Sequence, residues 1–289
     1  MHCRNLIHSI RRNGCRIPIR IIPYGGAPLR LNNHYDNVAL VDVADFPAEG
    51  RTFVEELKKR LPQCSTGLLR RYLAWFGEFD EFLYSDNDVV AVMNWEELFG
   101  HLQQFELVHA DCEYTTGGRF NFNQPEVFEQ IMGANSLQQA VTAGHFLCRR
   151  DPRQCEFLLG AARWMVDHAN IAKPHDQALL HIAVVLGNWK VLNLCKPPHK
   201  WASSWAGDYR DALDVIITIQ ARQQKISHIH FSGGVPSGAE AIQELLYAFD
   251  SPSERKRKLL MALLSDLSGL NKCKWYAKRA RHKLRSLAR

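Results

Sequence analysis

Apolar residues along the chain follow two spacings, and each spacing predicts one kind of element. Positions three and four residues apart, such as Leu6, Ile7 and Ile10, mark one face of a helix, whereas alternating or short continuous apolar runs mark strands. Helices are predicted over residues 4–13, 51–61, 66–76, 151–170, 176–186, 239–249 and 254–287. Strands are predicted over residues 17–22, 38–43, 79–84, 89–93, 105–109, 141–148 and 226–231. Strands interleaved with helices in this way indicate an α/β domain.

The charge of the chain is concentrated near its C-terminal end. The 289 residues carry a formal net charge of +6, but residues 253–289 hold twelve Lys or Arg against two acids, a net charge of +10. Residues 1–252 therefore carry −4. We expect a domain over 1–252 and a basic amphipathic helical tail over 253–289. The tail either packs with its charges in water or attaches to an anionic membrane surface; nucleic acid is disfavoured because no recognition motif accompanies it.

Composition excludes several other classes of protein. With 46% hydrophobic and 23% charged residues, the chain is globular rather than disordered or fibrous. No stretch reaches the roughly 18 uninterrupted apolar residues of a membrane span, and the first residues lack the apolar core of a signal peptide. The eight cysteines include no Cys-x-x-Cys pair, which argues against structural zinc. We expect a protein of a reducing compartment, cytoplasmic or peripheral at a membrane.

Two carboxylates follow an apolar strand in the middle of the first half. Asp86 and Asp88, separated by Asn87, come directly after the predicted strand 79–84. Hard divalent cations prefer carboxylate oxygens, and a cation held there can bridge to a diphosphate. Acidic turns after strands are also common without a metal, so the wider sequence context decides between the two interpretations.

That context resembles the nucleotide-sugar glycosyltransferases of the GT-A fold, with family 8 and its relatives as the nearest pattern. Many of them carry an "RxLxW…FDxxLYLDxDVVV" motif, to which Arg70, Tyr72–Trp75 and Phe79–Val90 are similar; Ser85 stands where the motif has Leu. Three further similarities follow in the family's order: Ala143-Gly144, Asp176-Gln177, and His230 before Phe-Ser-Gly233-Gly234. The ordered set is more specific than any one piece.

The resemblance implies an α/β GT-A fold, a Rossmann-like mixed sheet with flanking helices and a helical C-terminal extension. It implies a glycosyltransferase that moves a sugar from a nucleotide-diphosphate sugar, a UDP-sugar foremost, to a hydroxyl of a glycan or lipid-linked acceptor. Mn²⁺ or Mg²⁺ would be held by Asp86, Asp88 and His230. The donor would contact Arg70, Asp86, Asp88, Gly144, Gln177, Gly233 and Gly234, with Asp176 beside the sugar.

Asp111 and Glu113 are the remaining candidates for chemistry. Their spacing puts both side chains on the same side of an extended segment, where they could contact acceptor hydroxyls or stay solvated. If family 8 is the right relative, the anomeric configuration is retained and no base is needed. Otherwise one of these two acids is the candidate base for inversion.

Several of these assignments have alternatives. His228 has the same side-chain direction as His230 and competes with it as a ligand. Asp176 could be the cap of the helix that follows it, and Arg70 could be a solvated helix residue.

The N-terminal end departs from the family pattern. GT-A enzymes place a strand and a base-binding loop before the helix that residues 4–12 resemble, whereas this sequence starts within that helix. Either the start lies further upstream or the base is recognised by other residues. A catalytically inactive GT-A-like module that binds a glycan or a partner is therefore the alternative function.

Overall fold

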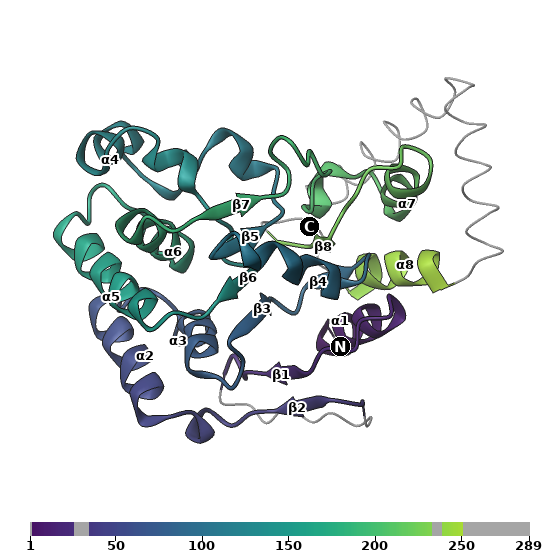
Figure 1. Ribbon diagram of the computed structural model, residues 1–289, viewed down its shortest axis with the longest axis horizontal. Helices are drawn as coiled ribbons and strands as arrows, with labels where there is room; N and C mark the ends of the chain where they lie inside the picture. The colour runs from purple at the N-terminus through teal and green to yellow at the C-terminus, as the bar shows by residue number, and fades with distance from the viewer. Residues whose placement is uncertain (1, 26–34, 233–238, 251–289) are drawn as a thin grey trace, which may run out of the picture.

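The computed structural model describes residues 2–25, 35–232 and 239–250. Its helices are α1 (His2–Arg12), α2 (Ala48–Arg60), α3 (Thr66–Leu69), α4 (Pro125–Met132), α5 (Pro152–Asp167), α6 (Asp176–Gly187), α7 (Ala212–Gln220) and α8 (Ala239–Asp250). Its strands are β1 (Ile19–Ile21), β2 (Val38–Leu40), β3 (Glu81–Ser85), β4 (Val89–Ala91), β5 (Leu107–His109), β6 (His145–Arg149), β7 (Val191–Asn193) and β8 (His228–His230). Figure 1 shows helices flanking the strands, the arrangement of an α/β domain.

The strands form a mixed central sheet and two small pairs. The central order is β3-β6-β5-β7, in which β6 runs antiparallel to β3 and β5, and β7 runs parallel to β5. β1 pairs with β2 in parallel, and β4 pairs with β8 antiparallel. Residues 86–88 therefore lead the chain from the central sheet to the β4-β8 pair. Because Val89 faces His230 in that pair, the end of β8 lies beside this connection.

Aromatic side chains hold β3 against the main core. Trp75 comes from the 3-10 helix Arg70–Phe76, and its ring lies 5.0 Å from Phe82 of β3 and 5.8 Å from Phe146 of β6, between centroids. Its indole N–H donates to Gln154 Oε1 at 2.7 Å, which satisfies a buried polar group. Helices α2, α5 and α6 contribute to the same core. This packing fixes the strand that ends at the acidic connection.

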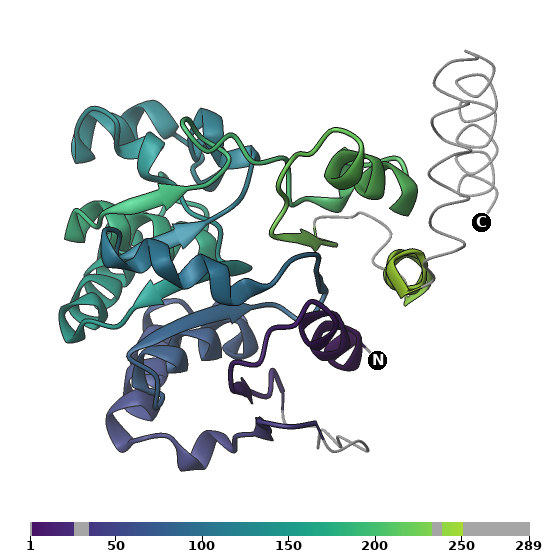
Figure 2. The same cartoon turned by 45° about the vertical axis from the view of Figure 1, so that its right-hand side comes forward.

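Strand β4 is fixed from its other side by α1. The Ser9 hydroxyl accepts the backbone N–H of Ala91 at 2.9 Å, and Arg12 and Asn13 side chains donate to the Ala91 carbonyl at 3.1 and 2.9 Å. The edge of β4 that β8 leaves open is thus hydrogen-bonded to helix side chains. Figure 2 shows α1 lying close to this part of the sheet.

A large, mainly apolar groove of about 1160 Å³ runs between β3 on one side and β1 and α1 on the other. Within the described residues, β3 has β6 as its one strand neighbour, so its other edge borders this groove. The groove ends at residues 86–88.

The predicted elements agree with most of the structure and differ in places. The predicted helix 66–76 divides into α3 and a 3-10 helix, and the predicted strand 141–148 begins only at His145, after a loop that bends at residues 143–144. Helices α4 and α7 and strand β7 were not predicted. β7 has three residues, too few for a period, and is defined by its pairing with β5.

The basic tail and two glycines of the predicted donor site lie outside the described residues. The basic tail 253–289 lies wholly beyond them, and so do Gly233 and Gly234. Among the residues that are described, no helix combines the length and apolar character that crossing a membrane requires.

Candidate active site

The connection 86–88, the loop 142–144, the start of α6 and the end of β8 enclose a cavity of about 230 Å³. Ten of its polar or titratable lining residues are Arg71, Asp86, Asp88, Asp111, Glu113, Tyr114, Asp176, Gln177, Ser204 and His230. Loops and the ends of strands thus bring together side chains from distant parts of the chain. Most of the site residues predicted from the sequence line this cavity.

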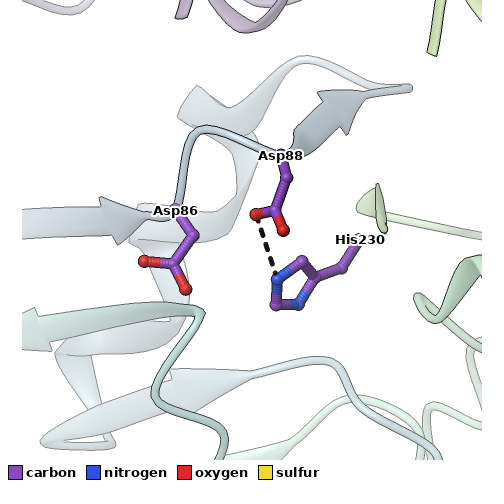
Figure 3. Close-up of side chains that lie close together, drawn as sticks. All are labelled: Asp86, Asp88 and His230. Atoms are coloured by element: carbon purple, nitrogen blue, oxygen red, sulfur yellow. Dashed lines mark ion pairs between the residues drawn. The ribbon is translucent and has the colours of Figure 1, made fainter. Parts of the chain in front are cut away.

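Asp86, Asp88 and His230 form a compact triad (Figure 3). One ligand atom from each lies within 4.8 Å of the others, and His230 Nε2 is 3.3 Å from Asp88 Oδ1. The Asp86 and Asp88 side chains are 28% and 30% exposed, so an ion can reach them. Burial lowers the pKa of His230, but its hydrogen bond to Asp88 and the charges of both carboxylates outweigh burial and leave that pKa raised.

The donor set of the triad fits a divalent cation. Carboxylate oxygens suit Mg²⁺ and Mn²⁺, and an added imidazole favours a transition ion such as Mn²⁺. Burial raises the pKa of Asp86, opposed by Arg71 and by the hydrogen bond from Tyr84, so this carboxylate gains from a nearby positive charge. Sequence reasoning therefore named three residues that the fold does bring together.

Gly144 lets the triad close. A Cβ built on it would lie 2.3 Å from His230 Cε1 and 3.2 Å from an Asp86 carboxylate oxygen. The Gly144 carbonyl also accepts the backbone N–H of Asp86 at 2.7 Å, which ties the loop 142–144 to the acidic connection. A side chain at this position would displace the imidazole or the loop.

Arg71 joins two carboxylates of the cavity. Its guanidinium lies 2.9 Å from Asp176 Oδ2 and 3.6 Å from Asp86 Oδ1, and it donates to the carbonyls of Leu68 and Ala143. The Arg71 side chain is 3% exposed. Burial lowers the pKa of Arg71, but the neighbouring Tyr84, Asp86 and Asp176 raise it by more than burial lowers it. Arg71 therefore stays charged. Buried charges persist when they are paired and hydrogen-bonded in this way.

Asp176 is the first residue of α6, but the cap of that helix is His175. The His175 Nδ1 accepts the Ala178 N–H at 3.1 Å, which leaves the Asp176 carboxylate free to pair with Arg71. The Asp176 carbonyl in turn accepts the hydroxyl of Tyr72 at 2.9 Å. His175, and not Asp176, is therefore the residue that caps α6. Gln177 lines the cavity beside Asp176.

Asp111 and Glu113 line the same cavity after the end of β5. Asn193 of β7 fixes this segment, because its amide donates to the Asp111 carbonyl at 2.8 Å and its oxygen accepts the Asp111 N–H at 3.4 Å. The Glu113 N–H donates to Asp111 Oδ1 at 3.0 Å. Burial raises the pKa of Asp111 to about 7, and burial followed by the charge of Asp208 raises that of Glu113.

Comparison with known proteins addresses the fold. No protein-family model matches the chain, and no curated protein matches its sequence. Among solved structures, apo mouse xyloside xylosyltransferase 1 aligns with a TM-score of 0.50 at 12% identity, over 82% of this chain and 92% of that one.

Two further structures align at 16% identity. The galactosyltransferase LgtC, solved with donor and acceptor sugar analogues, has a TM-score of 0.48 over 89% of this chain and 95% of its own. The bifunctional glycosyltransferase WbbM in its apo state has a TM-score of 0.46, over 85% of this chain and 46% of its own.

The alignment with the xylosyltransferase spans most of both chains and agrees with the mixed sheet and its flanking helices. The chain has the GT-A glycosyltransferase fold. The fold class predicted from the motifs is thereby confirmed. In this GT-A fold the acidic motif occupies the connection between β3 and β4, as the sequence pattern predicted.

Arg70, predicted to contact the donor, and His228, the alternative to His230, lie outside this cavity. The Arg70 side chain donates to the carbonyls of Pro23 and Gly25 at 3.0 and 3.3 Å and borders the large groove, not the smaller cavity. His228 stacks on buried His145, with ring centroids 3.7 Å apart, and hydrogen-bonds to the Ser227 hydroxyl. His230 rather than His228 therefore stands with the carboxylates.

Arg71, Tyr114 and Trp205 are among the cavity-lining residues that the sequence did not reveal as site residues. Arg71 directly follows the arginine that the motif comparison selected, so its place in the motif was a usable signal. Tyr114 and Trp205 lie in segments without a motif. Their positions depend on how distant strands pair, which no local pattern reports.

Proposed function

We propose that this chain is a glycosyltransferase that moves a sugar from a nucleotide-diphosphate sugar to an acceptor hydroxyl, assisted by Mn²⁺ or Mg²⁺. The observation that carries the proposal is the Asp86, Asp88 and His230 triad on the wall of the cavity. When bound, the cation would supply a Lewis acid that stabilises negative charge on the departing diphosphate. The GT-A fold supports the same reaction class.

We infer the position of the donor from the place where the small cavity and the large groove meet. The small cavity and the large groove share four lining residues, namely Leu68, Arg71, Asp86 and Asp88. A diphosphate at the triad can therefore extend its nucleoside into the groove and its sugar into the cavity. Arg70 borders the groove, so we assign it to the nucleoside side of the donor. Mainly apolar walls suit a flat base.

The sugar would lie next to Arg71 and Asp176. Because Arg71 pairs with both Asp86 and Asp176, it fixes the orientation of the two carboxylates. Asp176 and Gln177 can then accept hydrogen bonds from sugar hydroxyls. Pre-positioned groups of this kind lower the cost of reaching the reactive geometry.

We propose further that the transfer retains the anomeric configuration of the donor sugar. Asp176, the carboxylate on the sugar side, is engaged by Arg71, and Asp111 and Glu113 are assigned to the acceptor. The anomeric configuration of the product, read by proton NMR, tests this assignment. An inverted product would make Asp111 the base, for which a pKa of about 7 is well matched.

The proposal is tested by donor binding and hydrolysis. The full-length chain is incubated with Mn²⁺ and a panel of UDP-, GDP- and other nucleotide sugars, and release of the nucleoside diphosphate is measured. We expect at least one donor to be hydrolysed, and Asp88→Ala to reduce that rate about 100-fold or more because a metal ligand is lost. The nucleotide affinity is measured in parallel by calorimetry with and without Mn²⁺.

Asp80→Asn is the matched control, because Asp80 lies just before β3 and its side chain is 89% exposed in a pair with Arg150. It should behave like the unmodified chain. If no donor binds or reacts and Asp88→Ala changes nothing, the proposal fails. Metal-dependent binding without turnover across a broad acceptor panel would instead favour the inactive glycan- or partner-binding module.

We further propose that residues 253–289 attach the protein to an anionic membrane surface. Their net charge of +10 against −4 on the rest supports this placement. Co-sedimentation with anionic vesicles should retain the full chain and lose residues 1–252, whereas neutral vesicles should retain neither. Equal retention of the full and shortened chains on anionic vesicles would remove the membrane assignment.

A further inference from the structure

Trp205 is a large aromatic side chain exposed at the wall of the candidate active site. It lines the cavity together with His230 and Glu113, and 37% of it is exposed. A tryptophan of the core is normally covered, so exposure at a concave polar site needs a reason. Exposed aromatic rings at such sites offer a flat apolar face to a ligand that also carries polar groups.

The indole is held rigidly in spite of its exposure. Its N–H donates to the Ser232 carbonyl at 2.9 Å. A Cβ built on Gly207 would lie 2.4–2.6 Å from three carbons of its six-membered ring, so the backbone of Gly207 packs closely against the ring. Its backbone bridges to His230, whose N–H donates to the neighbouring Ser204 carbonyl at 2.7 Å. The ring is thus pre-positioned relative to the triad.

The polar residues of the same cavity provide a second, independent sign of a ligand. The Tyr114 side chain is 1% exposed and lines the cavity, and its hydroxyl has no hydrogen-bond partner among the residues that the structure describes. A buried hydroxyl without a partner is costly unless a ligand or water meets it. Asp111 and Glu113 stand beside it on the cavity wall.

The charge around these carboxylates differs from that around Asp86. Arg71 pairs with Asp86 and Asp176, whereas no described Lys or Arg pairs with Asp111 or Glu113. Asp208, the residue after Gly207, adds another negative charge that reaches Glu113. Among the described residues, the acids Asp111, Glu113 and Asp208 outnumber His230, the cation whose charge acts on Asp111, even when Asp111 is partly protonated near pH 7. A negatively charged ligand is therefore disfavoured in this half of the cavity.

A pyranose without a charged group matches these features together. One of its faces carries mainly C–H groups, which pack on an indole, and its hydroxyls donate to carboxylates and to a tyrosine oxygen. We infer that Trp205, Tyr114, Asp111 and Glu113 form the binding subsite of the acceptor, and that this acceptor is a neutral saccharide rather than an acidic one. The inference rests on the proposed function and names the acceptor class for the same cavity.

The transfer step balances with this placement. The acceptor hydroxyl oxygen bonds to the anomeric carbon of the donor sugar, and the bond from that carbon to the diphosphate oxygen breaks. The bonding electron pair leaves with the nucleoside diphosphate, which takes up the hydroxyl proton. No oxidant or further reactant is required.

The test is a titration of matched sugars followed by saturation-transfer NMR. The full-length chain with Mn²⁺ and UDP receives methyl glucoside, galactoside and xyloside, and the corresponding methyl glucuronide and galacturonide. We expect at least one neutral glycoside to bind and its uronide to bind about tenfold more weakly, from one added like charge near two carboxylates. Trp205→Ala should weaken the neutral sugar about tenfold, and Trp205→Phe much less.

Two variants keep the result interpretable. Glu113→Gln removes one charge from an exposed position, and should reduce the preference for the neutral sugar over its uronide several-fold. Val166→Ala, at an exposed position on α5, serves as a control with unchanged sugar binding. Thermal unfolding of each variant identifies a loss of fold.

The outcomes separate this inference from the proposed function. Binding of UDP with Mn²⁺ to the unmodified chain, measured by calorimetry, tests the donor site alone. If UDP binds but no neutral glycoside does, or uronides bind as tightly, or Trp205→Ala and Glu113→Gln bind as the unmodified chain does, the acceptor assignment is overturned. Binding of a Ser- or Thr-containing peptide in place of every glycoside would overturn it as well.

Discussion

At the scale of single residues, Arg71 determines the charge of the donor half of the cavity. Its guanidinium is paired with Asp176 at 2.9 Å and faces Asp86 at 3.6 Å, and it donates two further hydrogen bonds to the carbonyls of Leu68 and Ala143. One side chain therefore orients two carboxylates, one from the connection after β3 and one from the start of α6. Arg70, its neighbour in sequence, points instead toward the groove.

Replacing Arg71 by Met should therefore cost stability as well as activity. Removal of the cation leaves the Asp176 carboxylate buried without its partner, and we expect a loss of about 3 kcal/mol in the free energy of unfolding, measured with urea. Adding Asp176→Leu should recover part of that loss, because the uncompensated charge is then removed. An Arg71→Met variant as stable as the unmodified chain would contradict the buried pair.

At the scale of elements, the loop 142–144 and strand β8 set the geometry of the triad. β8 pairs with β4 so that His230 faces Val89, next to Asp88. The loop approaches from β6, and its carbonyl at Gly144 accepts the Asp86 N–H. The acidic connection, the loop 142–144 and the end of β8 thus meet at Gly144. The space there holds the hydrogen atom of glycine but not a methyl group.

We expect Gly144→Ala to weaken the binding of Mn²⁺ about tenfold or more, because the added methyl group would displace His230 from its ligand position. Isothermal calorimetry measures the affinity directly. Gly160→Ala on α5 is the matched control, since the nearest atom to its Cβ would be 3.7 Å away, an ordinary contact. Equal losses in both variants would mean that the effect is not local to the triad.

At the scale of the whole molecule, buried histidines link the fold to pH. Burial lowers the pKa of His109 and His145 to about 3 and that of His181 to about 4. Burial keeps His181 neutral, although the hydrogen bond that its ring makes to the Ser136 carbonyl raises its pKa. The Asn121 amide hydrogen-bonds to the other ring nitrogen. These three side chains come from β5, β6 and α6. Protonation of the histidines at low pH should therefore destabilise both the central sheet and the helix that covers it.

The sign follows from proton binding. Unfolded histidines have a pKa near 6.5 and take up protons first as the pH falls, so the folded state is most stable, as far as these groups are concerned, above that pH. Stability is lost as the pH falls from about 6.5 to about 4 for His181, and to about 3 for His109 and His145. Each such group contributes a slope of at most about 1.4 kcal/mol per pH unit. Urea unfolding at pH 7, 6 and 5 should show this loss, and His181→Gln should reduce its slope. An unchanged slope would assign the acid sensitivity to other groups.

The features that could be predicted from the sequence are those set by residues close together in the chain. The apolar run of β3 followed by Asp86 and Asp88, and the His-containing strand β8, follow from residue types at short spacing, and the order of these motifs predicted the GT-A fold that the structure confirms. Tertiary structure alone selected His230 over His228 and placed Arg71 and Trp205 in the cavity. These choices depend on strand register and on contacts between segments far apart in the chain, which a local pattern does not contain.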